Sequence, residues 1–326
     1  MMTLPQLQVH RPASVREAVA LLAAHPDARV LAGGTDLIPN LKYGMYETGH
    51  LVALRGLSAE LRYARRTGDG VALGALCTID QLARDPLVLQ ALPALADACR
   101  QIAGPQLRRM GTLGGNLCLD TRCVYINQSH FWRSALGFCL KKDGTACHVV
   151  AQGKRCVAAA SNDTAPVLLA LGASVRIAGP RGERVVPLSE FYLADGVHNT
   201  ALAPDELLVE ALVPAGPVPV KQAFFKLRTR AAIDFSALNL AVALAVEDGR
   251  VAALRLCVGA LAARPTLIQR LDDLVGRPAD LALAEELGRR AQKQCKPLTN
   301  IAMDPAWRRE VLPVLVRRTV VRALAG

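Results

Sequence analysis

The sequence predicts an α+β fold, and the order of its segments carries that prediction. Short strand-like runs alternate with short helical runs over the first two thirds of the chain. A proline-rich stretch, Pro214–Pro219, then precedes three longer apolar runs and two Ala-, Leu- and Arg-rich segments. Strands followed by helices after a proline-rich boundary are typical of a separate α+β domain.

The first elements lead to a glycine-rich segment. Residues 14–24 begin with Ser14 and place Glu17 three residues later, which predicts a capped amphipathic helix. Residues 28–31 form a predicted strand that runs into Ala32–Asp36, the sequence AGGTD. Backbone N–H groups after such a strand can bind phosphate, although an ordinary tight turn is an equal alternative. The spacing matches neither a Walker loop nor a Rossmann fingerprint.

A second glycine-rich segment follows a predicted α/β stretch. Strands are expected at 52–54 and 71–76, a Thr78-capped helix runs through Leu82, and helix 87–102 breaks near Pro93. Gly111–Asn116, the sequence GTLGGN, then predicts another turn at which backbone can approach an anionic ligand.

The remaining elements complete the α+β pattern. We expect a helix over 166–172, a hairpin of 174–177 with 185–187, and a strand over 207–213. Beyond the proline-rich boundary, strands are predicted at 223–227, 238–247 and 251–259, with Asp248–Gly249 as a hairpin turn. Helices are predicted over 264–296 and 305–323.

Composition excludes several classes of protein. A hydrophobic content of 52% over 326 residues excludes a mostly disordered chain and allows more than one core. We expect no membrane span, because charged residues or prolines interrupt every apolar run, and the N-terminus lacks the pattern of a signal peptide. A cytoplasmic location is therefore expected. The net charge of +11 is scattered along the chain, which favours a basic surface for partner subunits over nucleic-acid binding.

The nine cysteines predict a metal site rather than a disulfide framework. Four of them, Cys123, Cys139, Cys147 and Cys156, follow the spacing C-x15-C-x7-C-x8-C. Four thiolates within a short segment fit either a zinc ion or an iron–sulfur cluster, and the spacing does not choose between them. Unrelated buried cysteines are the simpler alternative, and His130 and His148 are further candidate ligands. The segment is otherwise polar around Lys141 and Lys142, which predicts a solvent-facing lobe.

The two glycine-rich segments together resemble those of a known family. AGGTD and GTLGGN, followed in order by SNDTAP at Ser161–Pro166, are similar to the FAD-binding medium subunits of the molybdenum hydroxylases, such as xanthine and carbon monoxide dehydrogenases. The resemblance implies a two-lobed FAD domain of the vanillyl-alcohol-oxidase or PCMH type. A C-terminal α+β domain with a three-stranded antiparallel sheet and helices would follow. It implies lobe 1 at 1–57, lobe 2 at 58–216 and a C-terminal domain at 217–326.

The same resemblance implies the residues that bind FAD. The glycine segments would cradle the pyrophosphate, Ile102 would line the flavin pocket, and Asp163, Leu208 and Lys226 would contact the rest of the cofactor. Arg109 departs from the family pattern, which usually has Asn there. The implied set is Arg29, Val30, Leu31, Ala32, Gly33, Gly34, Thr35, Asp36, Leu37, Ile102, Gly111, Thr112, Gly114, Gly115, Asn116, Asp163, Leu208 and Lys226.

About 40 residues, 119–160, separate GGNLC from the SNDTAP segment, where the family usually has a direct connection. This insertion makes the chain most similar to the β subunits of the 4-hydroxybenzoyl-CoA reductases. The resemblance implies a [4Fe–4S] cluster on Cys123, Cys139, Cys147 and Cys156. It further implies ferredoxin as electron donor and association with [2Fe–2S] and molybdopterin subunits as a dimer of heterotrimers.

No catalytic residue is expected in this chain, since the resemblance places the molybdenum site, and the reduction of 4-hydroxybenzoyl-CoA to benzoyl-CoA, in another subunit. Two alternatives stay open. One is the FAD subunit of an oxidative molybdenum hydroxylase with a structural loop, and the other is a non-enzymatic scaffold stabilised by zinc.

Overall fold

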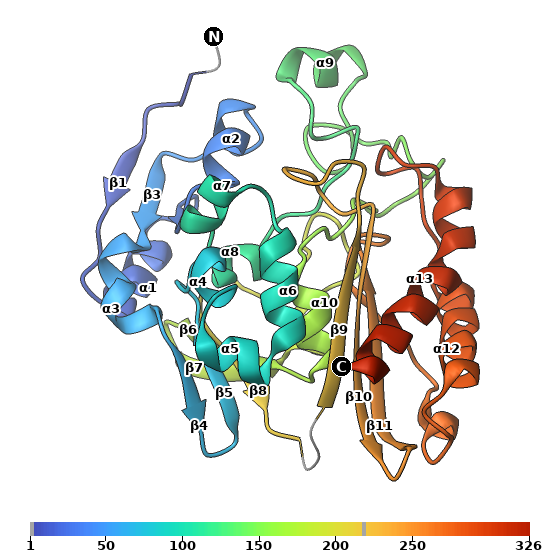
Figure 1. Ribbon diagram of the computed structural model, residues 1–326. Helices are drawn as coiled ribbons and strands as arrows, with labels where there is room; N and C mark the ends of the chain where they lie inside the picture. The colour runs from blue at the N-terminus through green and yellow to red at the C-terminus, as the bar shows by residue number, and fades with distance from the viewer. Residues whose placement is uncertain (1–2, 217–219) are drawn as a thin grey trace.

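Three β-sheets organise the chain in the computed structural model, which describes residues 3–216 and 220–326. Each sheet is built from one continuous part of the sequence, and helices fill the space between the sheets (Figure 1). Part of the predicted boundary Pro214–Pro219 falls on residues 217–219, which lie outside the described residues.

The first sheet is parallel and has the order β1-β3-β2. Ser14 caps the first helix by accepting a hydrogen bond of 3.1 Å from the Glu17 amide, which confirms the predicted helix start. The elements of this part are β1 (Gln8–His10), α1 (Val15–Ala24), β2 (Arg29–Leu31), α2 (Leu37–Lys42), β3 (His50–Ala53), η1 (Leu54–Leu57) and α3 (Ser58–Leu61).

The second sheet is antiparallel, with the order β4-β5-β8-β6-β7. Its strands are β4 (Ala64–Thr67), β5 (Gly70–Gly74), β6 (Ser174–Gly179), β7 (Gly182–Pro187) and β8 (Leu207–Pro214). The predicted hairpin of β6 and β7 is confirmed. The helices of this part are α4 (Ile79–Leu82), α5 (Pro86–Ala91), α6 (Pro93–Gln101), α7 (Pro105–Met110), α8 (Leu113–Leu117), α9 (His130–Ala135), α10 (Thr164–Ala170) and α11 (Leu188–Phe191).

The third sheet has four strands where three were predicted. The three expected strands are present as β9 (Val220–Leu227), β10 (Leu238–Glu247) and β11 (Arg250–Gly259). The fourth, β12 (Thr266–Leu267), pairs with β11, and its two residues are too few to give a periodic pattern. The predicted helix over 264–296 is wrong in its first half. That half holds β12, η2 (Asp272–Leu274) and the breakers Gly276 and Pro278, so α12 (Leu281–Gln294) begins only after the Asp280 cap.

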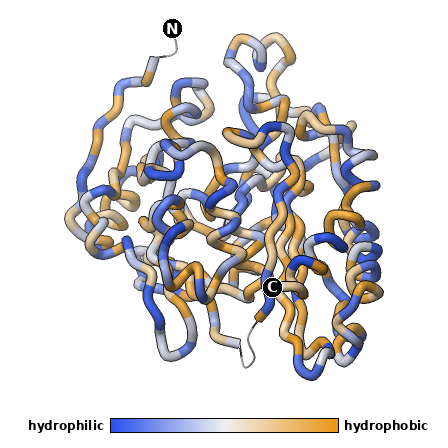
Figure 2. Tube along the Cα trace, viewed as in Figure 1, coloured by the Kyte–Doolittle hydropathy of each residue, from blue (hydrophilic) through white to orange (hydrophobic). Residues whose placement is uncertain are grey.

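The third sheet is buried on both faces, which joins the C-terminal part to the rest. Along β10, Leu240, Val242 and Leu244 pack in a core with α12 and α13 (Pro305–Ala325). Ala241 and Ala243 on the other face pack with residues of α6 and α10. Figure 2 shows the hydrophobic residues concentrated along β9, β10 and β11. Among the described residues no helix combines the length and apolar character needed to cross a bilayer.

Candidate cofactor cleft and cysteine site

One large cleft collects the residues expected to bind FAD. The two glycine segments, Ile102, Asp163, Leu208 and Lys226 all line it, although they come from all three parts of the chain. Leu31 alone of the implied set does not line the cleft. Its Cδ1 atom lies 3.2 Å from the position that a Cβ on Gly34 would take, so Leu31 packs behind the glycine turn.

The first glycine segment presents backbone donors to this cleft. Gly33, Gly34 and Thr35 line the cleft between β2 and α2, and no described residue accepts a hydrogen bond from their N–H groups. Gly34 has a φ of +71°, a conformation that glycine adopts at little cost. Adjacent backbone N–H groups without a protein partner, in residues that line a cleft, are suited to an anionic group such as a diphosphate.

The second glycine segment is a short helix, not the predicted turn of free donors. Thr112 caps α8 and accepts a hydrogen bond of 3.1 Å from the Gly115 amide. The Gly114 amide donates to Ala75 O at 2.8 Å, and Asn116 Oδ1 accepts from Thr164. These residues line the cleft, but the hydrogen-bonding capacity of Gly114 and Gly115 is already used inside the protein.

The two glycine segments touch each other directly. A Cβ atom on Gly33 would stand 1.9 Å from Met110 O and 3.1 Å from the Gly111 nitrogen, both of them backbone atoms. Only a residue without a side chain allows this approach. Gly33 therefore sets the distance between lobe 1 and the segment that leads into α8.

Asp163 and Lys226 lie together at the base of the cleft. Lys226 Nζ is 2.6 Å from Asp163 Oδ2, and both side chains are almost fully buried. Ser236 and Asn239 donate to Asp163 Oδ1 at 2.5 and 2.7 Å. The sequence prediction gave Asp163 and Lys226 separate contacts to the cofactor, whereas in the structure they form one ion pair across two parts of the chain.

Several cleft residues carried no signal in the sequence. Ile102 is followed by Ala103, whose φ is +44°, and Ile233 faces it with a φ of +51°. Both residues are non-glycine in the left-handed region, where strain often accompanies a functional role. Arg122 stacks over Phe235 with its guanidinium carbon 4.2 Å from the ring centroid. These contacts join residues more than 100 positions apart, so no local pattern could reveal them.

The insertion leaves and rejoins the fold at one point. Arg122 and Ala159 exchange backbone hydrogen bonds of 2.8 and 2.7 Å, which closes the segment at its base. The segment then extends away from the sheets to α9, at the top of Figure 1. Arg133 of α9 is buried and donates to Tyr43 O and Gly44 O at 3.2 Å, so the insertion is held against the first part of the chain.

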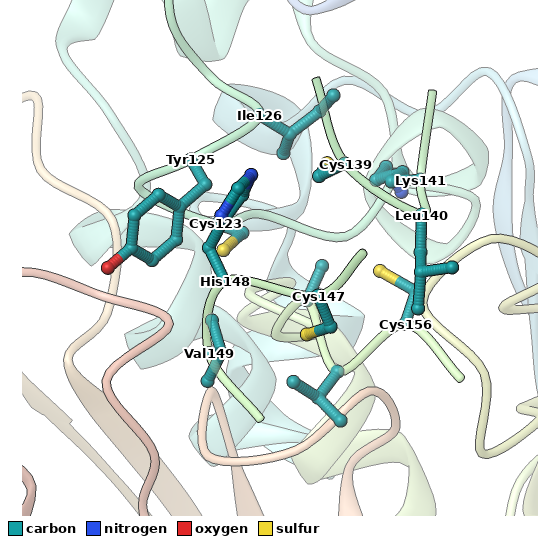
Figure 3. Close-up of a pocket in the computed structure, with 12 residues that line it drawn as sticks. Cys123, Tyr125, Ile126, Cys139, Leu140, Lys141, Cys147, His148, Val149 and Cys156 are labelled. Atoms are coloured by element: carbon teal, nitrogen blue, oxygen red, sulfur yellow. The ribbon is translucent and has the colours of Figure 1, made fainter. Parts of the chain in front are cut away.

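The four clustered cysteines line a single pocket. Figure 3 shows Cys123, Cys139, Cys147 and Cys156 around one space, with Tyr125 and His148 to one side. Burial raises the pKa of the Cys123 thiol to about 11, and the nearby thiols of the other three add to this increase. Burial also raises the pKa of Cys156. Four thiols around one space are suited to a metal centre, whose positive charge stabilises thiolates.

The four cysteines of this pocket differ in their surroundings from the other five. The Val150 amide donates to Cys147 Sγ at 3.4 Å, a contact that favours negative charge on sulfur. Within the described residues, 3–216 and 220–326, no three cysteine sulfur atoms all lie within 4.8 Å of one another. His148 lines the pocket with its Nε2 atom already 2.6 Å from Phe138 O, and His130 does not line it. The other five cysteines lie outside the pocket: Cys77, Cys99, Cys118, Cys257 and Cys295.

Lys141 lies between the cysteine pocket and the cleft and lines both. Its Nζ atom donates to Asp120 Oδ1 at 2.7 Å, Thr121 Oγ1 at 2.6 Å and Gly196 O at 2.5 Å. Asp120 also accepts a hydrogen bond of 2.8 Å from Tyr46, another cleft residue. The prediction of a solvent-facing lobe is therefore wrong for Lys141, whose side chain is only 7% exposed.

Known proteins share both the sequence pattern and the architecture of this chain. Residues 5–216 match the model of the FAD binding domain in molybdopterin dehydrogenase, and residues 223–323 match the CO dehydrogenase flavoprotein C-terminal domain. The xanthine dehydrogenase FAD-binding subunit of Escherichia coli O157:H7 is 29% identical, with 97% of this chain and 96% of that protein covered. The carbon monoxide dehydrogenase medium chain of Hydrogenophaga pseudoflava is 28% identical, with 98% of both chains covered. The crystal structure of quinoline 2-oxidoreductase from Pseudomonas putida 86 superposes with a TM-score of 0.81 at 25% identity, covering 100% of this chain and 99% of that one.

Gly33→Ala is expected to remove flavin from the purified protein. The added methyl group would overlap the Met110 carbonyl and push the two glycine segments apart. The ratio of flavin to protein absorbance measures the loss. Gly68→Ala is the matched control, because a Cβ there meets nothing within 4 Å. Full flavin content in Gly33→Ala would show that this contact does not shape the cofactor site.

Lys226→Met is expected to lower the free energy of unfolding by about 3–5 kcal/mol, because it leaves the Asp163 carboxylate buried without its cation. Urea denaturation of the flavin-free protein gives the value. Arg84→Met removes an exposed pair with Asp80 and is expected to cost less than about 1 kcal/mol. Equal effects of the two substitutions would contradict the assignment of a buried, coupled pair.

Proposed function

The chain belongs to the family of FAD-binding medium subunits of the molybdenum hydroxylases. From that premise we propose that it carries FAD in the cleft and transfers electrons within a multi-subunit molybdenum enzyme. The observation that carries this proposal is the convergence of the two glycine segments on one cleft that contains unpaired backbone donors. Bound FAD would supply one- and two-electron redox chemistry, while the substrate would react in a molybdopterin-binding subunit.

Residues of the chain divide the cleft into a polar part and an apolar part. The donors at Gly33, Gly34 and Thr35 suit the diphosphate, whereas Ile102 and Leu208 offer apolar surface for a ring system. The glycines of α8 and the Asp163–Lys226 pair support the walls of the cleft. In this proposal they act by fixing its shape, because their polar groups are already paired with protein atoms.

The cysteine pocket supports a second redox centre in the same chain. We assign Cys123, Cys139, Cys147 and Cys156 as ligands of a [4Fe–4S] cluster. A single zinc ion with Zn–S bonds of about 2.3 Å would bring its four sulfurs to about 3.8 Å from one another. Among the described residues, no three of these sulfur atoms all lie within 4.8 Å of one another. This spacing is wider than a single zinc ion requires, and it therefore favours a polynuclear cluster. Because burial raises the pKa of the Cys123 and Cys156 thiols, metal binding would release protons from them and would weaken as the pH falls.

The partners proposed for the chain are a molybdopterin-binding large subunit and a [2Fe–2S] small subunit. The named relatives include the FAD-binding subunit of a xanthine dehydrogenase and the medium chain of a carbon monoxide dehydrogenase. These relatives support an oxidative molybdenum hydroxylase as the whole enzyme.

A second candidate is reductive, and the insertion favours it. A subunit of the 4-hydroxybenzoyl-CoA reductase type would use the additional cluster to receive electrons from reduced ferredoxin. The complex would then remove the phenolic hydroxyl to give benzoyl-CoA. Low-potential electrons suit this reaction, and iron–sulfur clusters reach such potentials. The four-cysteine pocket beside the cleft is the observation that supports this candidate.

Replacing any one of Cys123, Cys139, Cys147 or Cys156 by Ser is expected to remove most of the iron and leave most of the flavin. The cleft is built mainly from residues outside the insertion, so the flavin should tolerate loss of the cluster. Iron analysis and the visible spectrum of protein purified without oxygen provide the two measurements. Cys118→Ser is the control, since Cys118 lines the cleft but not the cysteine pocket. Iron retained in Cys139→Ser, or zinc in place of iron in the wild type, would refute the cluster.

Activity of the native complex separates the two candidate enzymes. We expect a reductive complex to form benzoyl-CoA from 4-hydroxybenzoyl-CoA when supplied with reduced ferredoxin, and Cys139→Ser to slow this at least about tenfold. An oxidative hydroxylase would instead oxidise its substrate with an electron acceptor, and product analysis by mass spectrometry distinguishes the two. Oxidation of xanthine or a related heterocycle, with no benzoyl-CoA formed, would exclude the reductive candidate.

A further inference from the structure

Three of the chain's six histidines meet at the first sheet, next to the cleft that Pro26 and Asp27 help to line. His10 lies at the end of β1, His25 follows α1, and His50 begins β3. None of the three lines the cofactor cleft or the cysteine pocket. All three are half-buried, so they are reachable from solvent without being free to move as exposed side chains.

The ring nitrogens of these histidines converge. One nitrogen of each ring lies within 4.8 Å of the corresponding nitrogens of the other two. His10 Nε2 and His50 Nδ1 are 3.0 Å apart. The rings are stacked, with centroids 4.0 Å apart for His25 and His50 and 4.9 Å apart for His10 and His25.

Regular structure holds all three side chains in place. β1 and β3 pair in parallel with Gln8 opposite His50 and His10 opposite Val52, so the two histidines are diagonal neighbours on one face. The His25 amide donates to Leu21 O at 3.1 Å, and its carbonyl accepts from Ala28 at 2.9 Å, which fixes it between α1 and β2. Two of the three residues stand on strands, where side chains are held more precisely than on loops.

We propose that His10, His25 and His50 bind a divalent transition-metal ion of the zinc class. Three imidazoles with a fourth position open to water form a known type of zinc site. With Zn–N bonds of about 2.0–2.1 Å, tetrahedral ligands lie about 3.3 Å apart, which is between the 3.0 Å pair and the 4.8 Å limit observed here.

A carboxylate accompanies two of the ligands. Asp27 lies two residues after His25, and its Oδ2 atom accepts a hydrogen bond of 2.7 Å from Gly49, the residue before His50. This hydrogen bond ties the segment that follows His25 to the residue that precedes His50.

The ion would act as a clip on the first sheet. It would join β1, the end of α1 and β3. β3 pairs directly with β2, the strand that leads into the Ala32–Asp36 turn. Because an ion that binds only the folded chain stabilises it, occupancy would raise the stability of this part. The inference does not depend on the nature of the centre at the four cysteines.

Zinc titration of the flavin-loaded full chain, after removal of metal by a chelator, tests the proposal. We expect the wild type to bind one zinc ion at His10, His25 and His50. In His25→Ala or His50→Ala, the dissociation constant of this ion should rise at least about 100-fold. His130→Ala, on α9, should bind as the wild type does. X-ray absorption at the zinc edge should show that this ion has a nitrogen and oxygen shell at about 2.0–2.1 Å.

Two further measurements, flavin content and the unfolding temperature, test the zinc site even if a variant folds poorly. Flavin content reports whether each variant is folded. In the wild type alone, adding zinc should raise the unfolding temperature, and a chelator should reverse the increase. Equal zinc content in the wild type and in folded His25→Ala would overturn the proposal. So would a wild-type ion bound only by sulfur at about 2.3 Å, or no stabilisation by zinc.

Discussion

The buried carboxylate of Asp163 is the interaction on which the arrangement of the molecule depends. Asp163 directly precedes α10, while its three partners, Lys226, Ser236 and Asn239, all belong to the C-terminal part. A charge removed from water is tolerated only when its partners are correctly placed. Because the Asp163 carboxylate must keep these hydrogen bonds and its ion pair, β9 and β10 are fixed against α10. The surface formed where they meet is the base of the cleft.

Polar side chains link the cleft with the cysteine pocket. Tyr46, Asp120 and Lys141 form a hydrogen-bonded chain from one to the other, and the ammonium group of Lys141 lines both. A buried cation stabilises negative charge on either side of it, and it does so strongly where solvent screening is weak. The two sites therefore share one electrostatic environment, and a change of charge at one is felt at the other.

The sequence revealed the elements with local signals and missed those that depend on distant contacts. The Ser14 cap, the β6–β7 hairpin and the break at Pro93 follow from neighbouring residues, and the structure confirms them. The four cysteines stood out because an odd total of nine does not suit a disulfide framework and four of them are closely spaced. By contrast, β12 is too short to show a period, and α8 was taken for a turn because its glycines are helix-breaking by propensity. Packing of Gly114 against Ala75 overrides that propensity. The cluster of His10, His25 and His50 was missed because its members lie 15 and 25 residues apart, and only strand register together with the end of α1 brings them close.

The base of the insertion has an evolutionary consequence. Residues 122 and 159 pair with each other, so the chain re-enters the fold beside the place where it left. The strand order of the host sheets is independent of everything between these two residues. A segment attached in this way can be acquired or lost as a unit, without any change in the path of the remaining chain. An ancestral flavin domain could thus gain an additional segment in a single genetic event, after which its contacts with the host, such as those of Arg133 and Lys141, were refined.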